Sequence, residues 1–337
     1  MKRYRPHILV ACVLAIVFLT GAHRALQNAL TDMRFGWFPR QASGDIVLVA
    51  IDSPSIAKVG VWPWPRDRHA EMIDNLIAAG ASDIVFDVDF SSPSNPKSDQ
   101  AFADALQRAG GSVVLPAFMQ LVAGADSGKT IHVNRPLPQF DKHAWSAIVN
   151  VAVEPDGLVR RYPFGEMLDD KFLPSVGALL AGKYSNQEQP LRIDFSIQAD
   201  SLPTVSYADV LRGDPAALAA LKDKKVVIGA TAIELGDRFS VPNGHVVAGP
   251  KLQMLAGESI LQGRGLRLAS DISTIGGLGL ILFLMVSLWR RLSASLRVLV
   301  LLGLSLTAEA SAMLLQVKWA VVLDTSYWHL AVAAYLA

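Results

Sequence analysis

Residues 45–90 read DIVLVAIDSPSIAKVGVWPWPRDRHAEMIDNLIAAGASDIVFDVDF, and this stretch decides the fold. It begins at 45–52 with a continuous apolar, β-branched run that ends in an acid, and it ends at 83–90 with a second stretch typical of a buried strand. The residues between the runs have helical spacing on one apolar face, formed by Met72, Leu76 and Ala79. A strand, a helix and a strand in this order predict a right-handed βαβ unit of a parallel sheet.

A stiff aromatic turn, WPWP, connects the first strand to the helix. Proline fixes its own φ and disfavours helix at the residue before it, so Trp62 and Trp64 are held in an extended path and the helix begins after the second proline. We expect the two indoles to lie beside the strand ends, with Arg66 and His69 pointing towards nearby carboxylates. Two interpretations are open: a rigid staple over the sheet edge, and one wall of a ligand pocket.

The same alternation of elements extends along the chain. Residues 99–111 predict a helix closed by glycines, 112–118 a third strand, and 226–232 another buried strand. Residues 120–205 are less regular and favour antiparallel hairpins, and a last helix begins at Gly249. We therefore predict an α/β fold, with a mostly parallel sheet flanked by helices, an irregular middle insertion and additional transmembrane helices.

The composition indicates that part of the chain lies in lipid. Of the 337 residues, 51% are hydrophobic and 18% are charged, whereas an ordinary soluble domain is about 25% charged. An apolar run at 8–19 follows three cations, and longer runs lie at 272–289 and 298–317. The last of these carries Glu309, which either lies near an interface or pairs with a neighbouring helix, or else marks a functional relay. A further run begins at His329 and stops at the end of the given sequence, so we expect a third span that is cut short.

The distribution of cations predicts the topology. Cations cluster before the first apolar run and between the next two, and the positive-inside rule assigns both clusters to the cytoplasm. We therefore expect a membrane anchor at 1–22, an exported domain at 23–270 and transmembrane helices at 271–337. The anchor is expected to stay uncleaved, because the amphipathic stretch at 23–35 can continue its helix; the alternative is a signal peptide cleaved at the small residues Thr20, Gly21 and Ala22.

Several classes of function are disfavoured. The net charge is +1 and no basic stripe is present, so we expect no nucleic-acid partner. Cys12 is the only cysteine and lies in the first apolar run, which excludes disulfides, zinc–thiolate sites and cysteine nucleophiles from the folded part. AGADSGKT at 123–130 matches a permissive phosphate-loop pattern, but the prolines after it do not predict the helix that such a site needs. We expect a flexible loop there, and we predict no cofactor, no metal and no catalytic residue.

Four acids at or near the ends of predicted strands form the main candidate site. They are Asp52, Asp87, Asp89 and Asp237. Ligands of parallel sheets bind beyond the carboxyl ends of the strands, and clustered carboxylates there bind a hard cation or a polar ligand. A structural interpretation is also open, in which these acids cap helices or pair with nearby arginines. Those arginines are Arg66, Arg68 and Arg238.

Residues 45–90, and the WPWPR segment in particular, closely resemble the opening of CHASE2, an extracytoplasmic sensory domain of bacterial signalling receptors. The likeness continues in VNVAVEPDGLVRRYPF, which is similar to the Asp-Gly-x-x-Arg stretch of the family through Asp156, Gly157 and Arg160. It continues again in KKVVIGATAIELGDRFSVP, and the apolar runs match the layout of one helix before the domain and three after it. The sequence departs from the family near Gln253, where a His-Ala pair is expected.

The resemblance implies a membrane-anchored sensory module of a bacterial receptor, with the sensor domain in the periplasm. Its partners would be a small-molecule or envelope signal, the inner membrane, a second copy in a homodimer, and a cytoplasmic effector in cis. The effector, absent from this chain, would be a nucleotide cyclase, a cyclic-di-GMP enzyme or a kinase. An envelope interaction scaffold and an exported enzyme that uses the carboxylates remain as alternatives. The candidate ligand-binding residues are the four acids together with Trp62, Trp64, Arg66, His69, Asp156 and Arg160.

Overall fold

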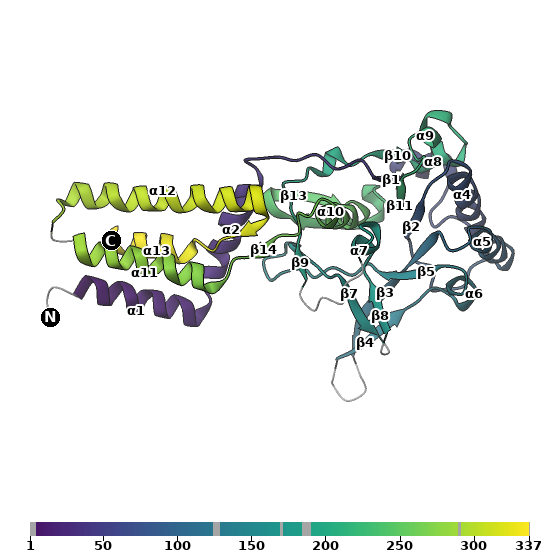
Figure 1. The fold of residues 1–337 in the computed structure, drawn as a ribbon. Coiled ribbons are helices and arrows are strands. Elements are labelled where there is room, and N and C mark those ends of the chain that lie inside the picture. Colours follow the sequence, from purple (N-terminus) through teal and green to yellow (C-terminus); the bar gives the residue numbers. More distant parts are fainter. Residues whose placement is uncertain (1–4, 124–128, 169–170, 184–189, 289–290, 337) are drawn as a thin grey trace. The chain divides into compact units, whose positions relative to one another are not determined.

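The computed structural model describes the chain except for residues 1–4, 124–128, 169–170, 184–189, 289–290 and 337 (Figure 1). The phosphate-loop match therefore lies mostly outside the described residues. The chain divides into two compact units. One is an α/β unit of residues 40–265, and the other is a helical unit of residues 1–39 and 266–337. The helical unit thus includes residues 23–39, which the sequence-based division placed in the exported domain.

A seven-stranded sheet forms the centre of the α/β unit. Its order is β10-β1-β11-β2-β3-β4, with β5 pairing β3, and all these neighbours run parallel except β3 and β4. The predicted mostly parallel sheet is therefore confirmed. The strands are β1 (Ile46–Ile51), β2 (Asp83–Asp87), β3 (Val113–Ala123), β4 (Lys129–Asn134), β5 (Trp145–Ile148), β10 (Thr204–Ser206) and β11 (Lys225–Ala230).

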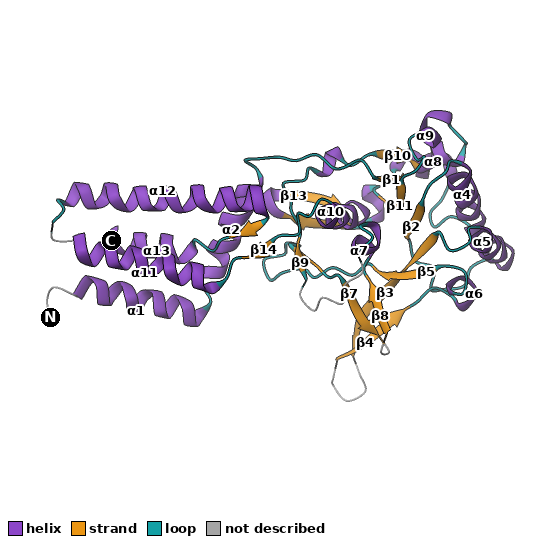
Figure 2. Cartoon of the chain, in the orientation of Figure 1, coloured by secondary structure: helices purple, strands orange, loops and turns teal. Residues whose placement is uncertain are grey.

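Helices cover both faces of the sheet, because alternate residues of the central strands are apolar on both sides (Figure 2). Val47 and Val49 belong to the apolar core beneath α4 and α5, which we call the α4 core. Ile46 and Leu48 belong to the apolar core on the other face, beneath α7 and α10, which we call the α10 core. The helices of this unit are α3 (Ser53–Val59), α4 (Arg66–Ala78), α5 (Pro96–Arg108), α6 (Pro138–Asp141), α7 (Val176–Leu180), α8 (Tyr207–Leu211), α9 (Pro215–Ala219) and α10 (Gly249–Leu261).

The irregular middle of the α/β unit contains antiparallel pairs, as predicted. They are β3 with β4, β6 (Arg161–Tyr162) with β9 (Leu191–Arg192), β7 (Gly165–Leu168) with β8 (Lys171–Pro174), and, later in the chain, β12 (Arg238–Val241) with β13 (His245–Ala248).

The largest differences from the predicted boundaries have local causes. The strand expected at 83–90 ends at Asp87, and Phe90 beyond it turns into the α4 core. Helix α5 begins earlier than expected, because the Asn95 side chain accepts a hydrogen bond from the backbone of Lys97 at 2.9 Å and proline follows at the first helical position.

The helical unit contains α1 (Arg5–Thr20), α2 (His23–Phe35), α11 (Asp271–Leu288), α12 (Ala294–Trp319) and α13 (Ser326–Leu336), with the short strands β14 (Arg267–Leu268) and β15 (Val321–Val322). Helices α11 and α12 are long and apolar enough to cross a membrane. The expectation that residues 23–35 continue the first helix is wrong. Gly21 has φ +68°, a left-handed conformation that ends α1, and α2 is a separate helix.

A polar network lies inside the helical unit and compensates the charge of Glu309, which is carried by an apolar helix. Its carboxylate accepts two hydrogen bonds from Arg34 on α2, both at 3.0 Å. Thr325 donates a third hydrogen bond at 2.5 Å, and His329 of α13 lies 2.7 Å away. Glu309 therefore pairs with neighbouring helices, which was the structural alternative stated for it, and the apolar helices hold a compensated charge rather than an isolated one.

Candidate functional site

A cavity of about 500 Å³ lies at the carboxyl ends of β2 and β11, and we call it the strand-end cavity. This is the place where parallel α/β sheets bind ligands. The cavity is lined by the turn before α4, the segments after β2, β5 and β11, parts of β3 and β12, and the first turns of α10. Its lining includes Trp62, Asp87, Asp89, Phe118, Asn150, Asp237, Phe239, Gly249 and Gln253.

Asp87 is placed in the cavity by the register of β2 against β11. It is the last residue of β2 and lies opposite Gly229 of β11. A Cβ atom at position 229 would lie 3.1 Å from the Cβ of Asp87 and 2.9 Å from that of Pro250 on α10. Glycine at this position therefore lets the helix and the aspartate approach the same point of the sheet.

Asp237 is held at the amino end of α10. The backbone N–H of Gly249, the first residue of that helix, donates to the carbonyl oxygen of Asp237 at 3.1 Å. A Cβ atom at position 249 would lie 2.6 Å from the Asp237 carboxyl carbon, so only glycine leaves room for the carboxylate there. The cavity is thus shaped around two aspartates that are far apart in the sequence.

The two carboxylates share an environment that disfavours their ionisation. Burial, together with the negative charge of Asp237, raises the pKa of Asp87 to about 7. Burial also raises the pKa of Asp237 above its ordinary value. Within the described part of the chain, neither carboxylate forms a hydrogen bond. Both therefore retain their full capacity to accept hydrogen bonds from a ligand.

The amide side chains at the cavity are already committed to the protein. Gln253 accepts a hydrogen bond from the Tyr162 hydroxyl and donates one to the carbonyl oxygen of Val149 at 2.8 Å. Asn150 accepts from the backbone N–H of Met119 at 2.6 Å and donates to its carbonyl oxygen at 2.7 Å. These amides fix the walls, and the carboxylates are left as the polar groups that face the space.

Four of the predicted site residues line this cavity: Trp62, Asp87, Asp89 and Asp237. Asp89 is exposed, and its carboxylate accepts a hydrogen bond from the backbone of Ser91 at 2.8 Å. The Trp62 and Trp64 rings pack in a T-shaped arrangement, with ring centroids 5.1 Å apart. The WPWP turn is therefore both a staple and a cavity wall, because one indole is buried and the other reaches the cavity.

The prediction that Arg66 and His69 point towards the strand-end acids is wrong. Arg66 is buried and pairs with Asp99 of α5 at 2.8 Å. His69 is 2% exposed and lies 3.0 Å from the Tyr207 hydroxyl, and burial lowers its pKa to about 4. Trp64 is also buried, and its indole N–H donates to the carbonyl oxygen of Gly60 at 2.8 Å. All three side chains stabilise the α4 core instead of lining the cavity.

The remaining predicted residues lie elsewhere in the α/β unit. Asp52 caps α3 by accepting a hydrogen bond from the backbone of Ser55 at 2.8 Å, as the structural interpretation expected. Asp156 pairs with Arg160 at 2.8 Å, and this pairing lowers the pKa of Asp156. Arg160 is buried and also pairs with Glu154 at 2.9 Å.

The arginines that were proposed as partners of the acids in the strand-end cavity pair with other residues. Arg66 pairs with Asp99, and Arg68 pairs with Glu71 at 3.3 Å. Among the described residues, neither Asp87 nor Asp237 has an ion pair. These two acids therefore lack the neutralising partners that a purely structural role would require.

Sequence reasoning missed Phe118, Phe239 and the two shaping glycines. The aromatic residues come from β3, which pairs with β4, and from β12, which pairs with β13. Both pairs are antiparallel and lie outside the regular alternation of strands and helices. Gly229 did carry a signal, because a glycine inside a buried strand often marks a close approach of another segment.

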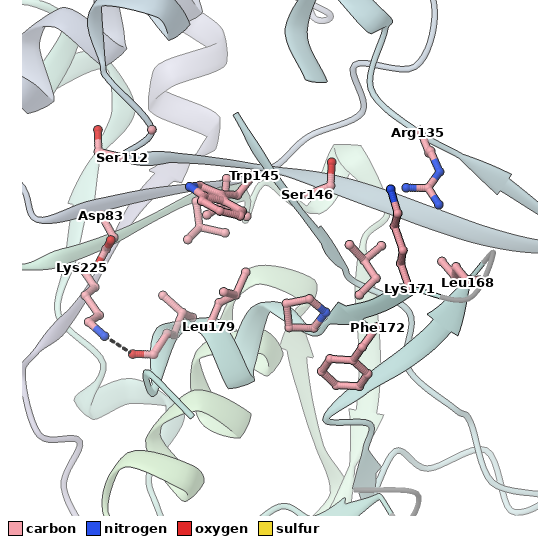
Figure 3. A pocket seen from close by; sticks show the side chains of 16 residues that line it. Asp83, Ser112, Arg135, Trp145, Ser146, Leu168, Lys171, Phe172, Leu179 and Lys225 are labelled. Atoms are coloured by element: carbon pink, nitrogen blue, oxygen red, sulfur yellow. Dashed lines mark hydrogen bonds between the residues drawn. The ribbon is translucent and has the colours of Figure 1, made fainter. Parts of the chain in front are cut away.

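A second cavity of about 640 Å³ lies near the amino ends of β2 and β11, and we call it the amino-end cavity (Figure 3). Arg135 and Lys171 lie near one another at one end of it, and Asp83 and Lys225 lie at the other (Figure 3). The Lys225 ammonium donates to the carbonyl oxygen of Leu180 at 2.6 Å. None of the predicted site residues lines this cavity. Across the part of the chain that the structure describes, no group of three or more His, Cys, Asp or Glu side chains is placed to hold a metal ion.

The fold and the site together define a class of protein. A parallel α/β unit with a ligand-sized cavity beyond its strand ends, in a chain with two membrane-length apolar helices, is suited to sensing at a membrane. The chain belongs to the CHASE2 domain family of extracytoplasmic sensory domains, whose family model matches residues 9–289. Searches among curated proteins and among solved structures gave no match.

Proposed function

We propose that this chain is the sensing and membrane-spanning part of a bacterial receptor, and that the strand-end cavity binds its signal. The observation that carries the proposal is the pair of partly buried aspartates, Asp87 and Asp237, which face a formed cavity without a hydrogen-bond partner in the described chain. Unpaired carboxylates destabilise a folded domain. Their presence at the strand ends is explained by a ligand that uses them.

Helix α10 is the element that would transmit binding. Its first residue contacts Asp237 in the cavity, and the chain that follows its last turn continues to α11. Near that end, Arg264 pairs with the buried Asp194 at 2.8 Å. This ion pair fixes the chain that follows α10 to the rest of the α/β unit. A ligand that binds one position of α10 more tightly than another would shift the equilibrium between the two positions.

The topology follows from the cations of the sequence. Arg3 comes before α1 in the sequence and Arg5 is the first residue of α1, while Arg291 lies between α11 and α12 and Arg297 lies in the first turn of α12, which favours a cytoplasmic location for both clusters. The α/β unit is then periplasmic, and the effector that it controls is cytoplasmic. We further propose that the receptor acts as a homodimer whose effector is a nucleotide cyclase, a cyclic-di-GMP enzyme or a kinase.

Cysteine labelling in cells tests the topology on which the receptor function depends. With the native Cys12 replaced by serine, a single cysteine is introduced either at the exposed Gln100 of α5 or at the exposed Ser295 at the start of α12. A maleimide that does not cross the inner membrane is expected to label Gln100→Cys in intact cells and Ser295→Cys only after lysis. The opposite result would place the α/β unit in the cytoplasm and refute the receptor function.

A further inference from the structure

The strand-end cavity has one sign of charge. Three carboxylates line it, those of Asp87, Asp89 and Asp237, and among the described lining residues there is no lysine, arginine or histidine. Because the amides at its walls are hydrogen-bonded to the protein, the three carboxylates are the charged groups that face the space, and each accepts hydrogen bonds once it is ionised. The chemistry of the cavity therefore favours a ligand that brings hydrogen-bond donors and positive charge.

The remaining walls are aromatic and aliphatic. Trp62, Phe118 and Phe239 contribute rings from three separate elements, and valine, alanine and leucine side chains complete the lining. Aromatic faces attract organic cations through the ring quadrupole, and they cover the carbon substituents that such cations carry. A bare metal ion gains nothing from these walls, and the described residues provide no group of three metal-ligating side chains.

We propose that the strand-end cavity binds an organic ammonium ion, whose cationic head lies between Asp87 and Asp237 and whose carbon substituents contact the aromatic walls. This proposal rests on the proposed sensory function and names the class of its signal. The ammonium head would neutralise two carboxylates that repel each other and would donate the hydrogen bonds that they lack. A cavity of about 500 Å³ suits a small amine or a methylated ammonium compound.

The amino-end cavity provides an internal comparison. It is lined by Arg135, Lys171 and Lys225 with a single acid, Asp83, so its charge disfavours an ammonium ion. A variant in that cavity, Lys171→Ala, should therefore leave ammonium binding unchanged. The two cavities of one chain thus predict opposite sensitivities to the charge of the ligand.

Calorimetry on the purified full chain in detergent tests the class of ligand. The probes are methylammonium, tetramethylammonium, 1,4-diaminobutane and choline, with 3,3-dimethyl-1-butanol as the uncharged carbon analogue of choline. At pH 8, we expect at least one ammonium probe to bind, and we expect the uncharged analogue to bind at least tenfold more weakly than choline if choline is that probe. Failure of all four ammonium probes to bind would overturn the proposal, and so would equal binding of choline and its uncharged analogue.

Matched variants locate the binding. Asp237→Asn should weaken the ammonium probe at least tenfold, while Asp104→Asn, an exposed acid on α5, should leave its affinity unchanged. Trp62→Leu keeps the carboxylates and should lower the affinity for a methylated ammonium ion several-fold. Unchanged affinity in both Asp237→Asn and Trp62→Leu would overturn the assignment to this cavity. Circular dichroism of each variant separates a lost fold from a lost ligand.

The two proposals fail in different ways. If the maleimide labelling places the α/β unit in the periplasm but no ammonium ion binds, the receptor function stands and the ligand class is wrong. If the labelling places that unit in the cytoplasm, the receptor function is wrong, and the calorimetric result still decides whether the cavity selects ammonium ions.

Discussion

The ionisation of Asp87 should make the α/β unit less stable as the pH rises. Its pKa is raised in the folded protein, so the folded state holds the proton more tightly than the unfolded chain does. The cost therefore starts near the ordinary pKa of 3.8 and is complete above about 7. A pKa shift of one unit corresponds to about 1.4 kcal/mol. The rise of the Asp87 pKa from 3.8 to about 7 therefore lowers the free energy of unfolding by about 4 kcal/mol at pH 8 and by about 1 kcal/mol at pH 4.5.

Asp87→Asn removes this cost while keeping the size of the side chain. For a unit of this length, 1 kcal/mol shifts the Tm by roughly 2–4 °C, so the variant should melt about 8–16 °C above the native chain at pH 8. At pH 4.5 the gain should fall to about a quarter of that in free energy. The measurement is scanning fluorimetry of the full chain in detergent at both pH values.

An exposed acid serves as the control for this prediction. Asp104→Asn should change the Tm by less than about 2 °C at either pH, because surface substitutions of this kind are usually worth within about 0.5 kcal/mol. A gain for Asp87→Asn that is equal at both pH values would refute the reasoning. A loss of stability at pH 8 would refute it too, since it would mean that the carboxylate is favourably bound by the protein.

Three other substitutions test separate parts of the structure by the same melting assay. Gly249→Ala overlaps the carboxylate beside it and should cost about 1–3 kcal/mol, whereas Gly265→Ala, whose new Cβ atom would lie 3.8 Å from the Cβ atom of Leu191, should not. Arg34→Met breaks a buried ion pair in the helical unit and should cost about 3–5 kcal/mol, unlike the exposed Lys318→Ala on α12. The pKa of His69 is lowered to about 4, so the native chain loses stability as the pH falls from 6.5 towards 4. His69→Phe should reduce this loss. An unchanged dependence of Tm on pH would contradict the lowered pKa of His69.

The fold was largely predictable, because burial on both faces leaves a clear pattern in the sequence. Residues 46–51 and 84–86 are continuous apolar runs since each strand contributes alternate side chains to two cores. Asp87 and Asp237 were also predictable as neighbours, because one ends a strand and the other follows a strand, and both strands end at the same edge of a parallel sheet.

The partners of the charged residues were not predictable, because they depend on tertiary packing. Arg66 was expected to face the strand-end acids, but α5 packs beside α4 and brings Asp99 within 2.8 Å of it. A buried guanidinium requires such a partner, yet the sequence does not reveal which acid supplies it. Phe118 and Phe239 were missed for a related reason, because their place at the cavity depends on how β3 and β12 pair and pack, which the pattern of residues does not reveal.

The order of the strands has a consequence for biogenesis. Strand β11 lies between β1 and β2, although about 140 residues separate it from β2 in the chain. Until residue 230 has left the ribosome, β1 and β2 each present an open hydrogen-bonding edge at what will become the middle of the sheet. The nascent polypeptide therefore cannot close its central sheet stepwise, and holding factors that shield those edges should matter most for chains stalled before this strand is made.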